Sequence, residues 1–160
     1  MEFVIEERNK IKAFFFKSML NGWASNYKKI KISRMPNYKA IQFTEGNLYS
    51  LDNYCVSSGS KKSAGTTTIW EDGVVQWIMF FGGFYKKEVI SFLKEALMKN
   101  YQQGIFLGGR GPEFYRNSSL IYENKVTKNE FEDFDGREEI KDANSGKILG
   151  YHKYSGMSLY

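Results

Sequence analysis

The second half of this chain repeats part of its first half. GVVQWIMFFGGF, which begins at Gly73, aligns with GKILGYHKYSGM, which begins at Gly146. Each copy runs from a turn glycine through apolar and aromatic residues to a closing glycine, and each follows a segment typical of a hairpin's partner strand. We therefore predict an internal β repeat near 65–84 and 136–157. The seam between two such units is a common place for a ligand pocket.

Two amphipathic helices are expected beside these strands. Residues 2–21 carry apolar side chains at spacings of three, four or seven, and Asn21-Gly22 supplies a helix stop. Residues 86–101 have the same periodicity, with Val89, Phe92 and their neighbours on the buried stripe. Helix, strands, helix and strands in this order predict an α+β fold with a mostly antiparallel sheet.

The remaining segments read as short strands and loops within a single domain of 160 residues. Strands are expected at 38–43, 48–56, 119–126, 130–134, 137–141 and 147–154, and a hairpin is expected at 66–81 with its turn at residues 71–73. Alternation along 48–56 predicts one face that is shared by Leu48, Ser50, Asp52, Tyr54 and Val56. Residues 74–81 are apolar at nearly every position, which predicts a central strand covered on both faces. Polar or glycine-rich composition indicates loops at 57–63 and 104–113, and a basic connector at 25–36.

The totals favour a cytoplasmic protein that does not span a membrane. No run of about 18 apolar residues is present, and the acidic N-terminus lacks the layout of a signal peptide. Cys55 is the single cysteine, so no internal disulfide can form, as is usual in a reducing compartment.

Positive charge is concentrated in the first part of the chain. Residues 1–64 hold 11 Lys and Arg against 5 Asp and Glu, although the whole chain has a net charge of +5. Such a segment either binds nucleic acid or an acidic protein surface, or is a solvated lysine-rich surface. The candidate contacts are Lys28, Lys29, Lys31, Arg34, Lys61 and Lys62.

A glycine-flanked arginine is the strongest local anomaly. Leu-Gly-Gly-Arg-Gly-Pro places Arg110 among three glycines, which leaves the guanidinium room to reach a carboxylate, phosphate or carbonyl group. The loop lacks the Lys-Ser/Thr ending of a phosphate-cradling loop. Two interpretations stay open: a ligand site, or a tight connector whose arginine pairs internally with Asp135 or Glu139.

For the first interpretation we expect a pocket between the two β-units. Arg110 would anchor an anionic or carbonyl group there. Trp77 and Tyr151 would supply flat walls, and Asp52 or Glu139 would orient the guanidinium. Aromatic residues in a β-rich chain are otherwise simply core.

Catalytic and metal-binding patterns are weak. His152 is the only histidine, so a zinc site would need unusual carboxylate help, and a structural histidine is the simpler interpretation. Glu138 and Glu139 follow Asp133 and Asp135, which indicates a solvated edge or arginine partners more readily than acid–base catalysis. We predict no cofactor, no metal and no enzymatic activity, because no nucleophile–base–orienter set is visible.

The order of motifs resembles an uncharacterised bacterial domain family, found alone or C-terminal to Xre-type helix-turn-helix regulators. The resembling pieces are residues 13–17, 23–24, 46–54, 77–83, 92–97, 110–112, 134–140 and 154–156. The resemblance implies a fold and a regulatory context, and it implies no reaction. The loop at 57–64 departs from the more regular pattern of the relatives.

We therefore expect a non-enzymatic binding or regulatory module that senses a small molecule or binds a partner, in a transcription-regulation or mobile-element setting. The alternative is a basic protein that binds nucleic acid or a nucleoprotein, such as an inhibitor of the anti-CRISPR type. A homodimer through the edges of the terminal strands is possible on either view.

Overall fold

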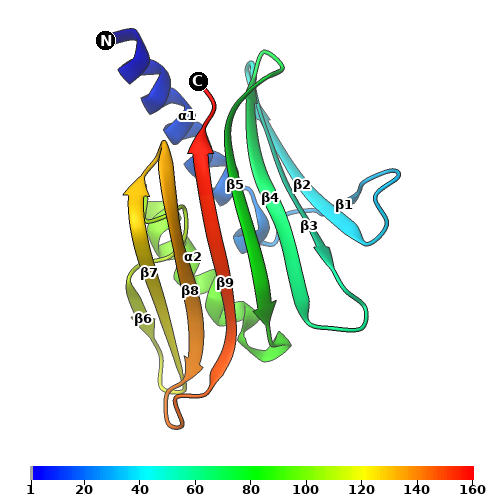
Figure 1. The fold of residues 1–160 in the computed structure, drawn as a ribbon, viewed down its shortest axis with the longest axis vertical. Coiled ribbons are helices and arrows are strands. Elements are labelled where there is room, and N and C mark those ends of the chain that lie inside the picture. Colours follow the sequence, from blue (N-terminus) through cyan, green and yellow to red (C-terminus); the bar gives the residue numbers. More distant parts are fainter. Residues whose placement is uncertain (1) are drawn as a thin grey trace.

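A nine-stranded antiparallel sheet carries two helices on one of its faces (Figure 1). The computed structural model describes residues 2–160, and the side chains of residues 5–160. The helices are α1 (Glu2–Leu20), η1 (Trp23–Ser25), η2 (Lys87–Val89) and α2 (Ile90–Gln103). The strands are β1 (Ile30–Lys31), β2 (Tyr38–Glu45), β3 (Leu48–Val56), β4 (Lys62–Glu71), β5 (Val74–Tyr85), β6 (Phe114–Arg116), β7 (Leu120–Glu130), β8 (Asp133–Asp142) and β9 (Ile148–Ser158). The predicted α+β class with a mostly antiparallel sheet is confirmed.

The strand order is β1-β2-β3-β4-β5-β9-β8-β7-β6. The edges are the short strands β1 and β6, whereas the C-terminal strand β9 pairs with β5 on one side and β8 on the other. Strand β9 therefore has no free edge through which a second copy could pair, because both of its sides already pair within the sheet. A homodimer through another edge stays a prediction.

The two echoed segments form hairpins that join edge to edge. Strands β4 and β5 make the first hairpin and β8 and β9 the second, and β5 pairs with β9 so that Phe81 lies opposite Tyr154. Backbone pairing therefore makes one continuous sheet across the repeat. Hydrogen-bonded strands leave no space between the units, so a pocket at this seam can lie only above a face of the sheet.

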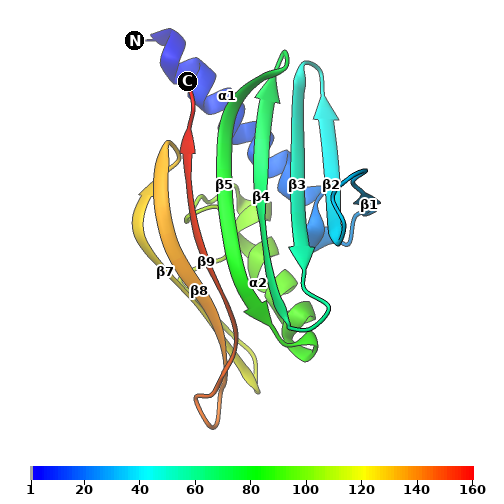
Figure 2. The same ribbon diagram turned by 45° about the vertical axis from the view of Figure 1, so that its right-hand side comes forward.

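Both helices lie against the same face, which we call the inner face (Figure 2). Helix α1 buries Ile11, Phe14, Phe15 and Met19, as its spacing predicts, and the Phe15 ring lies 5.1 Å from the Trp77 ring. Helix α2 ends where Gly104 adopts a left-handed conformation with a φ of 64°. Among the helices described, none is long and apolar enough to cross a membrane.

Alternation along the strands assigns each side chain to a face. On β3, the side chains of Ser50, Asp52 and Tyr54 share the inner face with Leu48, as the sequence predicts. On β5, Trp77 is fully buried on the inner face but Phe80 is 48% exposed on the outer one. The strand is central, and the prediction that both its faces are covered is wrong because both helices lie on one side.

Some element boundaries differ from those that the sequence predicts. The expected strands at 130–134 and 137–141 are one strand, β8, preceded by a tight turn at Phe131-Glu132. This turn is fixed by tertiary contacts, since the Trp77 indole donates a hydrogen bond of 2.8 Å to the Phe131 carbonyl. The basic connector contains η1 and β1, which are too short to show a periodicity.

Candidate ligand-binding cavity

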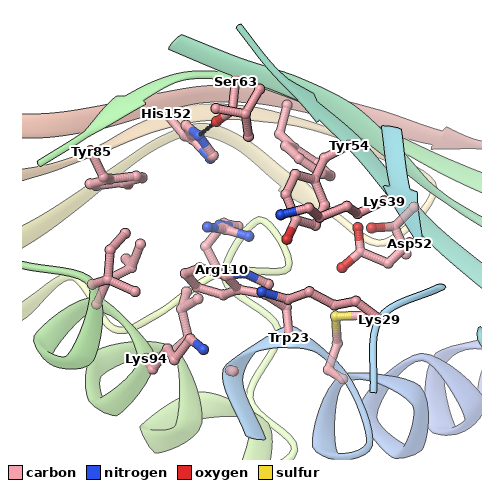
Figure 3. A pocket seen from close by; sticks show the side chains of 18 of the residues that line it. Trp23, Lys29, Lys39, Asp52, Tyr54, Ser63, Tyr85, Lys94, Arg110 and His152 are labelled. Carbon is pink, nitrogen blue, oxygen red and sulfur yellow. Dashed lines mark hydrogen bonds between the residues drawn. The ribbon is translucent and has the colours of Figure 1, made fainter. Parts of the chain in front are cut away.

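A cavity of about 660 Å³ lies between the inner face of the sheet and the helices (Figure 3). Strands β3, β4 and β5 form its floor, β9 contributes one residue, and η1, α2 and Arg110 cover it. The volume is within the range of about 300–1,000 Å³ typical of small-molecule sites.

Its walls are mostly apolar and aromatic. Phe81 and Tyr85 stand on β5. Trp23 in η1 lies across the cavity from Tyr85 (Figure 3). The remaining apolar and aromatic lining comes from Met19, Ala24, Tyr54, Val56, Met79, Ile90, Leu93, Leu97 and Tyr101. Such a surface accepts a flat or aliphatic group from water.

Five lysines surround the opening, and we call them the mouth lysines. They are Lys29, Lys39, Lys61, Lys87 and Lys94. All except the half-buried Lys94 are exposed, which places them where the cavity meets solvent. None of the five forms an ion pair with any residue that the structure describes. Asp52 is the one carboxylate among the described residues of the lining.

Two of these lysines repel one another. The Lys94 ammonium lies 4.5 Å from the centre of the Trp23 ring and donates to the Asn26 side chain, while Lys29 lies over Tyr54. Partial burial, followed by the charge of Lys29, lowers the pKa of Lys94. The mouth therefore holds an excess of positive charge that an anion would neutralise.

Arg110 reaches the cavity from the loop between α2 and β6. Gly108 and Gly109 both have positive φ, and the loop's carbonyl groups accept hydrogen bonds from the side chains of Asn100 and Tyr101 on α2. An Asn124 amide on β7 donates to the Gly111 carbonyl at 2.8 Å. These contacts hold the loop from two sides, so the direction of the arginine is set before any ligand arrives.

Arg110 is paired within the protein, and its partner is Glu138. Its guanidinium forms an ion pair with Glu138, which is fully buried, while Arg110 itself is 8% exposed. Tyr85 donates to the same carboxylate at 2.8 Å and Tyr122 donates at 2.6 Å. The predicted partners Asp135 and Glu139 are wrong because both alternate onto the outer face, one residue away from the inward-facing positions.

The ion pair keeps both of its members charged. Burial alone would raise the pKa of Glu138, but the charge and hydrogen bond of Arg110 outweigh it and hold the pKa below its ordinary value. Burial likewise opposes the charge of Arg110, yet Glu138 holds the arginine pKa well above its usual range. The pair is therefore neutral as a unit, and it attracts a ligand anion far less than an unpaired arginine would.

Asp52 lies deep in the cavity beside Thr67. The two residues are paired across β3 and β4, and Thr67 is buried. Burial raises the pKa of Asp52 to about 6, although Arg110 and Thr67 oppose the shift. Its Oδ1 atom is buried without a hydrogen-bond partner among the described residues.

His152 is the one β9 residue in the lining. Its Nε2 atom lies 3.3 Å from the Ser63 hydroxyl, and Gly83, which separates the two residues in the sheet, leaves space for this contact. Burial, followed by the charge of Arg110, lowers the pKa of His152 to about 4, so the ring is neutral at pH 7. Its Nδ1 atom has no partner in the described chain, so no acid orients the ring as in a catalytic triad.

Two of the predicted ligand residues, Arg110 and Asp52, line the cavity, and three do not. Trp77 is fully buried and stacks on Phe131 and Phe134, so it belongs to the core. Tyr151 and Glu139 are paired across β9 and β8 on the outer face, where Tyr151 packs against Arg137. These three assignments are corrected, because alternation along the strands directs their side chains away from the cavity.

The predicted basic contacts divide into two sets. Lys29 and Lys61 line the cavity, while Lys28, Lys31, Arg34 and Lys62 are exposed and lie outside the lining. Residues 28–34 and residues 61–62 thus come from two separate segments that both contribute a lysine to the mouth. The ligand pocket and the basic surface, which were predicted as alternatives, therefore lie side by side.

Other lining residues had no distinct signal in the sequence. Trp23 follows the helix stop directly, and Lys94 lies on the polar side of a helix whose stripe was predicted correctly. Helical periodicity identifies the buried stripe, but it does not indicate where a helix leaves the sheet uncovered. Glu138 and Glu139 are neighbours of the same residue type, and they differ only in the face of β8 on which their side chains lie.

Residues 52–158 match a family described as a domain of unknown function, DUF5680. The chain belongs to this family. The matched region carries Asp52, Arg110, Glu138 and His152, whereas Trp23, Lys29 and Lys39 precede it. No curated protein and no solved structure was found that matches the chain.

The described residues also contain no group of three or more His, Cys, Asp and Glu side chains that could hold a metal ion. Cys55, the one cysteine, is not part of a disulfide.

Proposed function

We propose that this member of the DUF5680 family is a non-enzymatic module that binds a small organic anion with a flat apolar body. One observation carries the proposal: lysines that form no ion pair with any described residue surround the opening of an apolar, aromatic cavity. In this arrangement the apolar body enters between the sheet and α2, and the charged group stays at the mouth.

The charge distribution supports this orientation of the ligand. The buried part of the lining holds Asp52 and Arg110, whose charge is neutralised by Glu138, whereas the mouth lysines form no ion pair with any described residue. An anion at the mouth would relieve the repulsion between Lys29 and Lys94. An anion at the deep end would instead face the Asp52 carboxylate.

A binding role accounts for the polar groups better than a catalytic one. Ser63 and His152 form a hydrogen bond, but the ring has no acid partner and its lowered pKa makes it a poor base. We propose that the module senses its ligand in the cytoplasm, within a regulatory context, and needs no cofactor.

The test is titration with 1-anilinonaphthalene-8-sulfonate, an aromatic anion that fluoresces when its ring system leaves water. We expect the double variant K29E/K94E to weaken binding by at least tenfold, since two attractive charges become repulsive. The matched control is K28E/K99E, which alters the same two segments and the net charge equally, but at exposed positions outside the lining. Equal losses in both variants would reject the cavity as the site.

A second candidate function is binding of nucleic acid or a nucleoprotein by the basic surface. It is favoured by the exposure of Lys28, Lys31, Arg34 and Lys62 next to the mouth. If phosphate contacts dominate, affinity for a single strand should fall with salt by a log–log slope of roughly 0.7 for each phosphate neutralised. Binding that is unaffected by salt, or by alanine at these four positions, would reject this function.

A further inference from the structure

The cavity demands polar contacts from its ligand as well as an apolar body. Among the described residues, five buried side-chain atoms lack a hydrogen-bond partner, and three of them belong to the lining: Asp52 Oδ1, Arg110 Nε and His152 Nδ1. A buried polar atom without a hydrogen-bond partner destabilises the folded protein. A ligand with hydrogen-bonding groups at these places supplies the missing partners, whereas a hydrocarbon tail does not.

These three atoms lie at different places along the cavity. Asp52 is on β3 and His152 on β9, three strand positions apart, which corresponds to about 14 Å across the sheet at 4.8 Å for each strand. One small polar group cannot reach both residues. Arg110 lies between them in Figure 3. The ligand therefore has polar groups at two levels, one near Asp52 and Arg110 and another near His152 and Ser63.

The chemistry differs between the two levels. The Arg110 Nε–H is a donor, and the Asp52 carboxylate is an acceptor, so the deep group presents both an acceptor and a donor and has no net charge. His152 and Ser63 both can donate or accept, which suits a hydroxyl. At the mouth, five lysines suit a group with more than one negative charge.

The walls determine the shape of what connects these groups. Trp23, Phe81 and Tyr85 face the space with aromatic rings, which pack against a flat ring. Nucleobases stack favourably on such aromatic side chains. A flat ring with a hydrogen-bonding edge, a hydroxylated spacer and a multiply charged anion is the composition of a nucleotide.

We infer that the ligand is a nucleoside phosphate that binds with its base toward Asp52 and Arg110, its sugar near His152 and Ser63, and its phosphate among the mouth lysines. This inference rests on the proposed function and specifies its substrate class. The nucleotide is either a free molecule or the terminal nucleotide of a strand, since the exposed basic residues beside the mouth could follow further phosphates.

The experiment is calorimetric titration with the four ribonucleoside 5′-monophosphates, the matching nucleosides, ribose 5-phosphate and a 5′-phosphorylated trinucleotide. We expect at least one monophosphate to bind, and both its nucleoside and ribose 5-phosphate to bind at least tenfold more weakly. D52N should weaken the nucleotide at least tenfold while leaving 1-anilinonaphthalene-8-sulfonate unchanged, because that anion has no edge for Asp52 to recognise. A thermal melt of D52N checks that the variant is folded.

Each outcome has a definite meaning. A trinucleotide that binds more tightly than the monophosphate assigns the site to a strand end, and equal or weaker binding assigns it to the free nucleotide. If the sulfonate binds through Lys29 and Lys94 but no nucleotide binds, or if ribose 5-phosphate binds as well as the nucleotide, the inference is wrong and the proposed function stands. If the sulfonate does not depend on these lysines, the proposed function fails as well.

Discussion

The β4–β5 and β8–β9 hairpins have similar sequences but different surroundings. Where the first hairpin has Thr67 and Met79 on the inner face, the second has Glu138 and His152. The loop that carries Arg110 packs on the second hairpin and fills the space above it, whereas the first hairpin forms most of the cavity floor. A repeated strand pattern therefore does not determine function; the segment that covers each copy does.

Two glycines show how closely the loop that carries Arg110 covers the second hairpin. A Cβ atom at Gly108 would lie 2.4 Å from the Tyr154 ring, and one at Gly111 would lie 2.8 Å from the Tyr122 hydroxyl. The loop thus contacts the aromatic side chains of β7 and β9 without space for a further methyl group. Within the described part of the chain, no comparable loop covers Phe81 and Thr67, which line the cavity.

The largest expected effect comes from the buried ion pair above the second hairpin. Glu138→Gln should lower the free energy of unfolding by about 3–5 kcal/mol, since it leaves the Arg110 charge buried without its partner. Thr67→Val, at the equivalent position of the first hairpin, should cost no more than about 1 kcal/mol. Urea denaturation measures both variants.

The double variant Arg110→Met/Glu138→Leu separates charge burial from packing. It should be less destabilised than the two single variants added together, because it leaves no unpaired charge. Additive losses would show that the ion pair does not explain the sensitivity of the second hairpin.

The next effect tests how closely the loop packs. Gly108→Ala should destabilise the protein by about 3 kcal/mol, because it adds a steric clash with Tyr154 to the strain of a positive φ. Gly146→Ala is the matched control: its φ is also positive, but no atom lies within 4 Å of the added Cβ. It should cost only about 1 kcal/mol. Similar costs at the two glycines would contradict a tightly covered second hairpin.

Substitution of Asp52, which lines the open cavity, should stabilise the protein, whereas the substitutions above destabilise it. Its pKa rises from 3.8 to about 6 on folding. Its contribution to the free energy of unfolding is therefore fully present below pH 4 and is lost as the pH rises through 6. Asp52→Asn should therefore stabilise the unliganded protein by about 1–2 kcal/mol at pH 7.5, with no gain at pH 4. Melting temperatures at the two pH values test this, and a gain that is independent of pH would argue against a buried carboxylate.

The smallest effect involves His152 and has the reverse pH dependence. Its pKa falls from 6.5 to about 4 on folding, so its contribution is complete above pH 6.5 and is lost as the pH falls toward 4. His152→Gln should abolish this loss of stability at low pH. At pH 7.5 it should lower the free energy of unfolding by less than about 1 kcal/mol. The measurement is the slope of the melting temperature between pH 4 and 6.5, and an unchanged slope would assign the titration to another group.

The fold could be predicted from the sequence to a large extent, because periodicity reports which side of an element is buried. The stripes of α1 and α2 and the alternation along β3 were predicted correctly. The site was predicted less well. Arg110 was found from the unusual composition of its loop, and Asp52 was named as a residue that orients it, but Glu139 was chosen over its neighbour Glu138, and in a strand an error of one residue reverses the face.

The cavity itself could not be predicted, for a physical reason. It exists because α2 and η1 cover β3, β4 and β5 without filling the space beneath them, and this depends on how distant segments pack. Trp77 and Trp23 illustrate the limit. Trp77 in β5 is fully buried in the core, whereas Trp23 in η1 lines the cavity. Residue type alone does not distinguish the two positions.

The three tryptophans permit the most direct test of where a ligand binds. Trp23 lines the cavity, Trp70 packs against Tyr49 on the outer face, and Trp77 is in the core. Their indole N–H signals can be recorded separately in ¹⁵N-labelled protein and assigned with Trp→Phe variants during titration with 1-anilinonaphthalene-8-sulfonate. We predict that the Trp23 signal moves with saturation while Trp70 and Trp77 stay nearly unchanged. Movement of Trp70 with an unchanged Trp23 would place binding on the outer face and contradict the cavity as the functional site.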